Sequence, residues 1–543
     1  MQRRPMTRRQ FITRAGGGMA LAAATPAVLA GCRNPGSTAA AGSSTSMPGP
    51  TTTRALAAVD PISPWWLQGN FAPVSREVSS TTLRVTGSVP EELAGLYVRN
   101  GSNSTNADSG HWFIGDGMVH GVRLEGGEAR SYANRWVRTS LYESGDGFAE
   151  AGPPGGAIGY SNVSAFTHAG RLLTSGEIGL PYELSPDDLS TVGVYDFGGK
   201  LDTNMTAHPK IDPDTGRMHF FGYGFFEPFL TYHVADAQGR LIHSAPIEVG
   251  RSTMMHDFAI TERDVVFWEF PVVLDLSMAA EGADLPFRWD PSYGARIGVM
   301  PLGGSNDDIR WVEVPPAYVF HGVNAFRDGD EVVVDVSQFA TMFEDGPLGQ
   351  SAELHRWRIN AAGESLTIKD ETLEDERPMD LPTRDPRRVG RTYRYGYLIE
   401  AVDNPDTVQL GGLYKQDFER NTHEYFDPGT DRVCDEGLFV PTGEAEDDGY
   451  VLTYSYNAER DGSDLLILAA QDFGAGPVAT VELPQRVPHG FTPPGCRPTV
   501  SAASSWWGSR LGRRWSTCRT VRRAGMNPPA SGCRPGGTTS ICP

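Results

Sequence analysis

The sequence predicts an all-β fold, either a propeller or a similar closed radial array of short strands. Short apolar or alternating runs recur from about residue 55 to 491, and alternation with a period of two indicates strands with one buried face. Glycine (63 residues) and proline (40 residues) are abundant, as in folds with many tight turns. Long stretches with the helical period are few, and no clear repeat of roughly 40 to 50 residues is visible. Examples of the runs are 331–336, 450–456 and 464–468, and examples of turn signals are 212–216 and 327–330.

The first 31 residues have the pattern of a twin-arginine signal peptide. The motif lies at residues 7–12, and an apolar stretch rich in alanine and glycine follows at 15–30. This stretch is too short to span a membrane well. Residues 29–32 resemble a lipobox, which favours lipid attachment at Cys32 over an ordinary cleavage site with a chance cysteine. We therefore expect export by the twin-arginine route to the cell surface or another extracytoplasmic place.

Residues 32–54 are rich in Ser, Thr, Ala, Gly and Pro, and we expect a flexible linker there. The β-rich domain is expected over 55–491, where Cys434 is its one cysteine, so the domain does not depend on disulfides. The formal charge of −20 argues against a nucleic-acid partner, because phosphate binding needs clustered Lys and Arg. The chain has no glycine-rich phosphate loop, serine nucleophile elbow or CxxC zinc pattern.

Three histidines adjoin apolar, strand-like residues: His208, His256 and His321, which lie 48 and 65 residues apart. That spacing would place each on a different blade of a propeller, with the side chains directed at one axis. Imidazole is a ligand for Fe, Zn, Cu and Ni, so the ligand type does not identify the metal. For one isolated histidine, an ordinary core or surface role would be the more common interpretation.

Many segments resemble, in order, the motifs of the carotenoid cleavage oxygenase family, which includes stilbene-cleaving enzymes and the retinoid isomerase of the visual cycle. The resemblance covers about residue 60 to 491. One departure is Ile114, at a position where many members carry Asp. The matching segments are 95–103, 111–120, 134–139, 201–210, 394–397, 415–417, 439–441, 446–450 and 483–488.

The resemblance implies a seven-bladed β-propeller with Fe(II) on its central axis. The family holds iron with four histidines, three of which correspond to His208, His256 and His321. It also uses carboxylates that accept a proton from the second nitrogen of a ligand and so fix its tautomer. Glu177 and Glu436 match two of these by motif, and Asp380 takes the third position with a shorter side chain whose reach is open.

The activity that the resemblance implies is cleavage of a carbon–carbon double bond by O2, which gives two carbonyl products. The substrate would be a carotenoid, an apocarotenoid or a stilbene, and no catalytic side chain is expected beyond the metal centre. An elongated apolar tunnel is needed, and Trp112, Phe113, Phe225 and Phe226 are candidates for its wall, although strand packing explains each equally well. Peripheral membrane contact or the lipid anchor would bring the enzyme to apolar substrates.

The chain departs from the family at its fourth histidine. Thr492 occupies that position, after the Arg-Val-Pro motif and a Gly-Phe pair. Residues 492–543 contain no Asp, Glu or Lys but hold Arg and four of the six cysteines, so they are opposite in charge to the domain. We interpret this tail as a frameshift, because inserting one C after the Phe491 codon permits His-Ala-Ala-Trp-Val-Pro-Ala-Asp. A disordered Arg/Gly/Pro-rich tail is the alternative.

The missing histidine and the altered tail have two consequences for function. With three histidines the site would bind Fe(II) weakly, or His489 or water would substitute, so the chain as written is expected to be poorly active. The last strand of the propeller is also expected to be missing, which would weaken closure of the ring. Two other functions remain open: a calcium- or zinc-dependent propeller lactonase, and an inactive family member that binds an apolar polyene without turnover.

Overall fold

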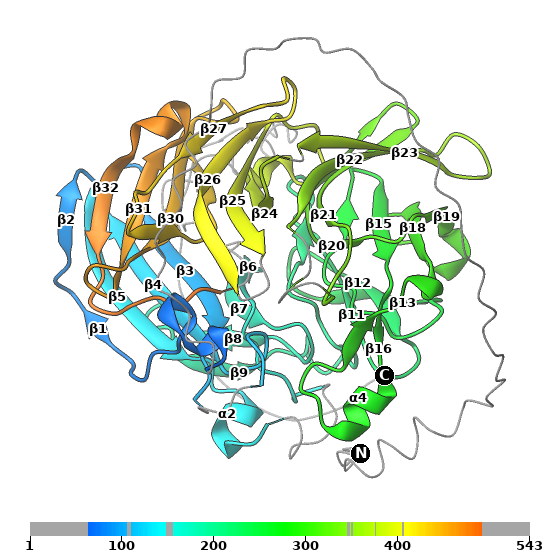
Figure 1. Cartoon of the computed structure of the whole chain (residues 1–543), viewed down its shortest axis with the longest axis horizontal. Helices are drawn as coiled ribbons and strands as arrows, with labels where there is room; N and C mark the ends of the chain where they lie inside the picture. The colour runs from blue at the N-terminus through cyan, green and yellow to red at the C-terminus, as the bar shows by residue number, and fades with distance from the viewer. Residues whose placement is uncertain are drawn as a thin grey trace, which may run out of the picture. The chain divides into compact units, whose positions relative to one another are not determined.

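Seven antiparallel sheets are arranged radially around one axis in the computed structural model (Figure 1). The structure describes residues 63–490, except 106–109, 148–155, 345–347, 349–350, 375 and 404–406. All of these residues belong to the compact unit 1–500. The expected β-propeller is therefore confirmed, with seven blades. The expected signal peptide, the lipobox at Cys32, the linker and the tail from 492 lie outside the described residues.

The first four blades follow one another along the chain; β2 (Arg84–Gly87) interrupts the first and joins the seventh, and β16 (Val272–Leu274) and β17 (Phe287–Trp289) interrupt the fourth and form a separate sheet. The first blade has β3 (Gly95–Ser102), β4 (Gly117–Glu125) and β5 (Glu128–Trp136), with β1 (Ser79–Ser80) at its outer edge. The second has β6 (Ser164–His168), β7 (Arg171–Ser175), β8 (Tyr182–Leu184) and β9 (Thr191–Val194). The third has β10 (Lys210–Ile211), β11 (Met218–Tyr223), β12 (Leu230–Ala235) and β13 (Leu241–Ile247). The fourth has β14 (Ala259–Ile260), β15 (Asp264–Glu269), β18 (Ala295–Pro301) and β19 (Arg310–Val314).

The last three blades continue the same pattern, and the seventh contains an additional strand from the start of the fold. The fifth has β20 (Tyr318–Asp328), β21 (Glu331–Phe339), β22 (Glu353–Asn360) and β23 (Thr367–Glu374). The sixth has β24 (Met379–Arg384), β25 (Tyr395–Asp403), β26 (Val408–Asp417) and β27 (Thr422–Phe426). The seventh has β28 (Arg432–Cys434), β29 (Leu438–Pro441), β30 (Gly449–Asn457), β31 (Gly462–Ala469), β32 (Pro477–Glu482) and β2 (Arg84–Gly87).

Helices are short and lie between strands. The pair β16 (Val272–Leu274) and β17 (Phe287–Trp289) forms a small separate sheet, and α4 (Leu276–Glu281) connects its two strands. Asp275 caps α4 by accepting hydrogen bonds from the backbone of Ser277 and Met278. The remaining short helices are α2 (Ser140–Ser144), η1 (Trp65–Leu67), η2 (Gly69–Phe71), η3 (Pro291–Tyr293), η4 (Asn306–Asp308), η5 (Pro386–Arg388) and η6 (Ala470–Ala475). No helix among the described residues is long and apolar enough to cross a membrane.

The ring closes because β2 pairs antiparallel with β32, from Arg84 opposite Glu482 to Gly87 opposite Ala479. Closure joins the two ends of the described chain, as full closure of a radial array requires. The expectation that the last strand would be missing is wrong for the described residues, because the seventh blade has its full set of strands before residue 490.

The runs expected to be strands at 331–336, 450–456 and 464–468 are strands β21, β30 and β31. The expectation of one buried face is wrong for them, since nearly every residue in their central parts is buried. Each middle strand has a neighbouring blade on both faces, so polar residues in these strands find partners inside the core. The expected turn at 212–216 is confirmed: Asp212 Oδ1 accepts hydrogen bonds from the N–H groups of Asp214 and Thr215.

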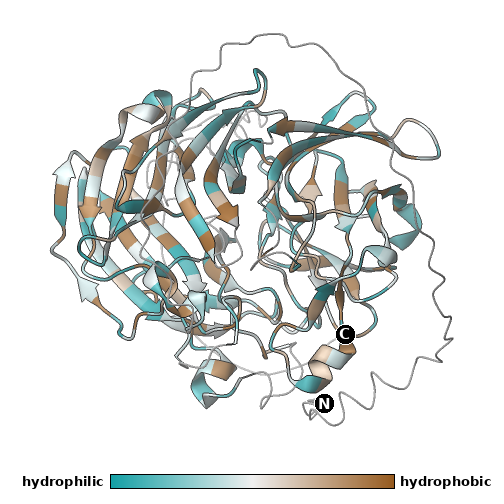
Figure 2. Cartoon of the chain, viewed as in Figure 1, coloured by the Kyte–Doolittle hydropathy of each residue, from teal (hydrophilic) through white to brown (hydrophobic). Residues whose placement is uncertain are grey.

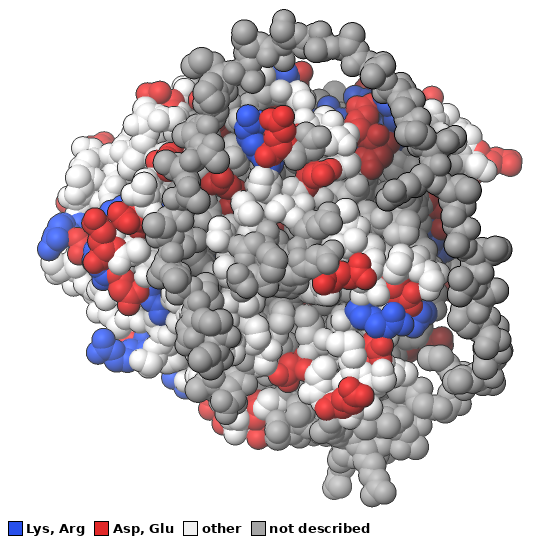
Figure 3. Space-filling model, in the orientation of Figure 1, with Lys and Arg blue, Asp and Glu red and all other residues white. Residues whose placement is uncertain are grey.

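Apolar side chains concentrate along the middle of the blades, and polar ones concentrate toward the outer strands and loops (Figure 2). On the face shown in Figure 3, acidic and basic side chains of the described residues occur in small separate groups. The interior of blades three to five forms one large apolar cluster that includes Phe258, Trp268 and Trp357. This rigid packing holds the inner strands that carry the histidines.

Candidate metal centre

The three histidines lie on or just before the inner strands of three consecutive blades. His208 precedes β10 of the third blade, and His256 precedes β14 of the fourth. His321 lies within β20, the inner strand of the fifth blade. The expectation that each would lie on a different blade and be directed at one axis is therefore confirmed.

The imidazoles of these residues converge. The ring centroids of His208 and His256 are 4.4 Å apart, and each lies 5.1 Å from that of His321. One ligand nitrogen from each ring lies within 4.8 Å of the others, and the Nε2 atoms of His208 and His256 are 2.7 Å apart. His321 Nε2 is buried and has no hydrogen-bond partner among the described residues. Such a cluster of buried imidazole nitrogens is the donor set of a transition-metal site.

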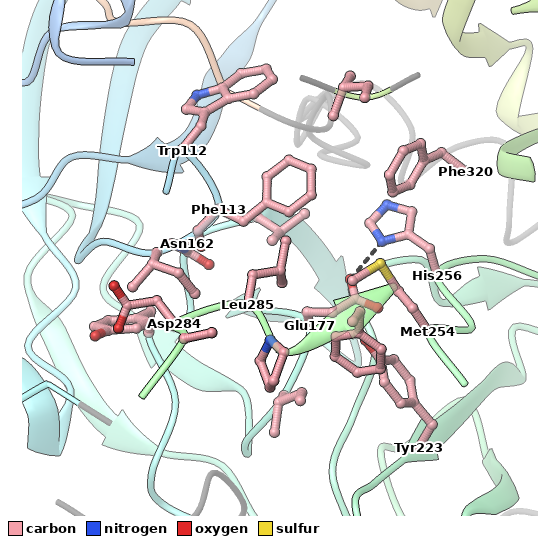
Figure 4. A pocket seen from close by; sticks show the side chains of 18 of the residues that line it. Trp112, Phe113, Asn162, Glu177, Tyr223, Met254, His256, Asp284, Leu285 and Phe320 are labelled. Carbon is pink, nitrogen blue, oxygen red and sulfur yellow. Dashed lines mark hydrogen bonds and ion pairs between the residues drawn. The ribbon is translucent and has the colours of Figure 1, made fainter. Parts of the chain in front are cut away.

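Two carboxylates hold the opposite nitrogens of these rings. Glu177, which follows β7, has Oε2 2.6 Å from Nδ1 of His256, the contact drawn as a dashed line in Figure 4. Asp380 in β24 has Oδ1 2.9 Å from Nδ1 of His321. A carboxylate at Nδ1 keeps the proton there and leaves Nε2 free of a proton to bind a metal.

The shorter side chain of Asp380 reaches His321 because the strand is irregular at this point. The pairing of β24 with β25 shifts register between Asp380 and Thr383. Leu381, the next residue, has a φ of 52°, a left-handed conformation that is uncommon outside glycine. A bulge of this kind re-aims a side chain toward the axis, and it compensates for the shorter reach of aspartate.

Burial and charge set the protonation of the cluster. Burial, with the neighbouring His256, His321 and Lys210, holds the pKa of His208 well below its usual value, so this ring is neutral. Burial opposes protonation of His256 too, but the carboxylates of Glu177, Asp257 and Asp380, with Glu177 contributing most, together outweigh it and raise the pKa of His256. A metal ion at this place would therefore compete with a proton on His256 and not on His208.

Glu436 lies between β28 and β29 on the inner side of the seventh blade and is 4% exposed. Burial raises the pKa of its carboxyl well above the usual value, against the Arg99 charge, and Asp435 and Asp380 raise it further. No described residue donates a hydrogen bond to Glu436, and it contacts none of the three histidines. The expectation that Glu436 orients a metal ligand is therefore not met by any histidine among the described residues.

His489 does not join the cluster. Its Nδ1 lies 2.7 Å from Asp435 Oδ1, and Asn70 Nδ2 lies 3.2 Å from the same nitrogen. Its ring packs on Phe71, with centroids 4.8 Å apart. The group of possible metal ligands within the described part of the chain holds His208, His256 and His321 alone. The expectation that His489 could replace a fourth ligand is therefore wrong for this structure.

A cavity of about 230 Å³ opens beside the cluster. His256, His321, Glu177 and Asp380 form part of its wall, and most of the other lining residues are apolar or aromatic. Figure 4 shows Trp112, Phe113 and Phe320 on one side of this space and Met254 and Tyr223 on the other, with Asp284 at the end away from His256.

The structure places three of the four aromatic residues proposed from the sequence in the wall of the cavity. Trp112, Phe113 and Phe225 line the cavity, whereas Phe226 is not part of its lining. Sequence reasoning missed the wall contributed by the segment after α4, including Leu285 and Phe287. Nothing local marks those residues, because the segment reaches the cavity only through the small sheet of β16 and β17.

The residues present fit a single divalent transition metal. The three nitrogens are buried and convergent, one of them has no other partner among the described residues, and carboxylates orient two of the rings. The donor set does not by itself distinguish iron from zinc, copper or nickel.

Comparison with known proteins agrees with the fold. Residues 71–492 match the model of the retinal pigment epithelial membrane protein family. The chain is 38% identical over 488 residues to a carotenoid cleavage oxygenase of Mycobacterium tuberculosis, covering 78% of this chain and 96% of that one. The lignostilbene dioxygenase of Pseudomonas brassicacearum superposes with a TM-score of 0.72 at 25% identity, covering 83% of this chain and 99% of that one.

A third similar protein is the apocarotenoid oxygenase of Synechocystis in its cobalt-substituted form, with a TM-score of 0.68 at 27% identity, covering 77% of this chain and 96% of that one. The match spans the whole propeller, and it includes the inner strands that bring the histidines together. The chain belongs to the carotenoid cleavage oxygenase family, the oxygenases that cleave carbon–carbon double bonds.

Proposed function

We propose that His208, His256 and His321 hold one Fe(II) ion, and that the chain uses it to cleave a double bond of an elongated, conjugated, apolar substrate with O2. The observation that carries this proposal is the convergence of three buried imidazoles at the wall of an apolar cavity. Cleavage of one C=C bond by one O2 gives two carbonyl products, with one oxygen atom in each. An iron ion bound there supplies the redox chemistry that activates O2.

The side chains of the chain contribute binding and orientation. Glu177 and Asp380 hold the protons on Nδ1 of His256 and His321, so that both Nε2 lone pairs are directed at the metal position. The aromatic wall formed by Trp112, Phe113 and Phe320 excludes water and places a flat conjugated chain beside the histidines. No side chain needs to act as an acid or a base in this scheme.

The substrate class follows from the cavity and from what the similar proteins act on. A carotenoid, an apocarotenoid and a lignostilbene all have a flat conjugated chain that fits an apolar wall, and we propose one of these for this chain. We also propose export by the twin-arginine route with lipid attachment at Cys32, supported by the sequence motifs at residues 7–12 and 29–32.

A second candidate is a protein that binds an apolar polyene without turnover. The observation in its favour is Thr492 at the position of the fourth histidine, together with a tail whose charge and composition differ from the propeller. Under this second proposal, the chain binds the polyene but cleaves it neither as written nor with the reading frame restored, whereas the oxygenase proposal expects low activity as written and more after restoration.

The experiment that decides between them measures bound metal and O2-dependent cleavage together. It uses the chain as written and a version with the frame restored after Phe491, each supplied with Fe(II), an apocarotenal and a hydroxystilbene. The oxygenase proposal expects iron and cleavage in the restored version, and the substrate that turns over identifies the subclass. If neither version binds iron or cleaves, while both bind the apocarotenal, the binding protein is the correct function. Resequencing the coding DNA tests the frameshift directly.

A further inference from the structure

The carboxylate of Asp257 contacts three of the inner chain segments, and each of these carries one of the clustered histidines. Asp257 directly follows His256 and is 1% exposed. Its Oδ2 accepts a hydrogen bond of 2.9 Å from the backbone N–H of Gly322, the residue after His321. Its Oδ1 lies 2.6 Å from Nζ of Lys210, two residues after His208. The Asp257 side chain therefore joins the third, fourth and fifth blades immediately behind the three clustered histidines.

The carboxylate is itself held in place. The N–H of Phe258 donates a hydrogen bond of 2.8 Å to Oδ1 of Asp257, so the side chain is folded back on its own backbone. The three contacts use both oxygens, and every donor is a backbone group or a buried ammonium. A buried carboxylate with this many fixed donors has one orientation.

The lack of a side chain at Gly322 permits this contact. The pairing of β20 with β21 shifts register on both sides of Gly322, and its N–H donates to Asp257. A Cβ at this position would lie 3.1 Å from the Trp268 ring and 3.6 Å from Asp257 Oδ2. The absence of a side chain lets β20 approach Asp257 and the Trp268 ring closely, and the adjacent bulge turns His321 toward the axis.

Lys210 supplies the contact from the third blade. It is 9% exposed, and its ammonium lies 5.8 Å from the centroid of the Phe258 ring. A buried ion pair seldom stabilises a fold more than apolar residues of the same size would, so a gain in stability is a weak reason for this pair. Its place directly behind His208 and His256 indicates a role in geometry.

We propose that Asp257 is a positioning residue of the metal centre, which holds the three histidine-bearing segments at the separation where their Nε2 atoms converge. The inference rests on the proposed metal site at His208, His256 and His321. Asp257 does not touch the substrate or the metal, and it acts through the backbone N–H of Gly322 and the ammonium of Lys210, which lie within two residues of His321 and His208.

The Lys210–Asp257 pair could act through its charge or by holding the segments in position, and the two explanations predict opposite changes in cation binding for Lys210→Met. Lys210 carries a positive charge near the cluster, so Lys210→Met should strengthen binding of a divalent cation if the pair acts through charge alone. If the pair acts by position, the same variant releases the segment of His208 from Asp257 and weakens cation binding. The sign of the change separates the two explanations.

The test is a titration of the metal-free full chain with Co(II), followed by visible absorption, for the starting protein, Asp257→Asn and Lys210→Met. The matched control is Asp335→Asn, because Asp335 is also buried and its carboxylate accepts hydrogen bonds from Arg356, at 2.7 Å, and from Tyr393 but from no residue of the segments that carry the three histidines. Thermal unfolding of each metal-free protein is measured in parallel.

Asp257→Asn is expected to weaken Co(II) binding about 10- to 100-fold, the range found when a residue that supports a ligand is changed. Lys210→Met is expected to weaken it several-fold, and Asp335→Asn to change it less than about threefold at a similar loss of thermal stability.

Equal effects of Asp257→Asn and Asp335→Asn, or tighter binding by Lys210→Met, would overturn the inference. If Asp257→Asn does not fold, Lys210→Met decides alone by its sign. A starting protein that binds no Co(II) refutes the proposed metal centre and the inference with it, whereas normal binding by both variants refutes only the inference.

Discussion

Histidine–carboxylate pairs occur both at the cavity and at the closure of the propeller, with opposite uses of the second ring nitrogen. At the cavity, Glu177 and Asp380 hold Nδ1 of His256 and His321, and the Nε2 atoms are directed at a shared point. At the closure, Asp435 holds Nδ1 of His489 in the same way.

The ring of His489 is enclosed by other groups. Asn70 lies within hydrogen-bonding distance of both ring nitrogens, Phe71 packs on the ring, and the N–H of His489 donates to Asn70 O. Asp435 also pairs with the buried Arg99 at 3.3 Å. The comparison teaches that the pair alone does not identify a metal ligand. The surroundings of the second nitrogen decide between a ligand and a structural support.

The largest difference between the two regions is expected when one histidine is removed from each. His256→Ala is expected to abolish metal binding and cleavage, because it removes one of three ligands and leaves Glu177 without its partner. His489→Ala is expected to retain bound metal while it lowers the thermal midpoint. Metal content by elemental analysis and a thermal melt of both variants check this. Loss of metal from His489→Ala, with the fold intact, would show that His489 is a ligand.

The closure region should carry the larger share of stability. Asp435→Asn leaves the charge of Arg99 buried without its carboxylate partner, and both side chains are at most 5% exposed. Removing one member of a buried ion pair costs about 3 to 5 kcal/mol of unfolding free energy. Urea unfolding of the metal-free chain measures this, with Arg84→Ala as the control, because its pair with Glu482 joins the same two chain ends at the surface. A cost below about 1 kcal/mol for Asp435→Asn would contradict the assignment.

Glu177→Gln sharpens the cavity side of the comparison with a smaller effect. The amide keeps the shape of the side chain but loses the charge that favours orientation and basicity of His256, and metal affinity should fall about tenfold or more.

The pH dependence of metal binding should change in the same variant. The pKa of His256 is raised above 6.5 because the Glu177 carboxylate, helped by Asp257 and Asp380, outweighs burial, so protons compete with the metal already above pH 6.5. Without the Glu177 charge the pKa of His256 falls, and the pH at which binding is half lost moves downward. Co(II) titrations between about pH 5.5 and 8 compare the two proteins. An unchanged pH profile would mean that Glu177 does not act on His256.

The smallest effect is expected from a pair at the surface. His355 in β22 lies 2.8 Å from Asp370, whose side chain is 45% exposed. Burial opposes protonation of His355, but the carboxylates of Asp370 and Glu353 together outweigh it and raise the pKa above 6.5. Its contribution to stability is therefore full below pH 6.5 and is lost as the pH rises through the raised value.

Solvent screening limits that contribution to less than about 1 kcal/mol. His355→Gln is expected to reduce stability slightly at pH 6 and not at pH 9, as urea unfolding at both values would show. A loss of the same size at both pH values would mean that the charge of His355 plays no part.

The sequence alone was enough for the features that depend on residue identity and local order. The imidazoles of His208, His256 and His321 were recognisable from their spacing and apolar neighbours, and the ordered motifs indicated the family and its seven blades. Strands at 331–336 and 450–456 were predictable because alternation and turn residues are local signals.

Only the tertiary structure decided how distant segments meet. The bulge at Asp380 and Leu381 lets the short aspartate side chain reach His321. The packing of Asn70 and Phe71 keeps His489 out of the cluster. The burial of both faces of the middle strands, the wall contributed by the segment after α4, and the contacts of Asp257 with two other blades are of the same kind. Such contacts join residues far apart in the chain, and their distances depend on the packing of whole blades against one another, for which a single sequence contains no local signal.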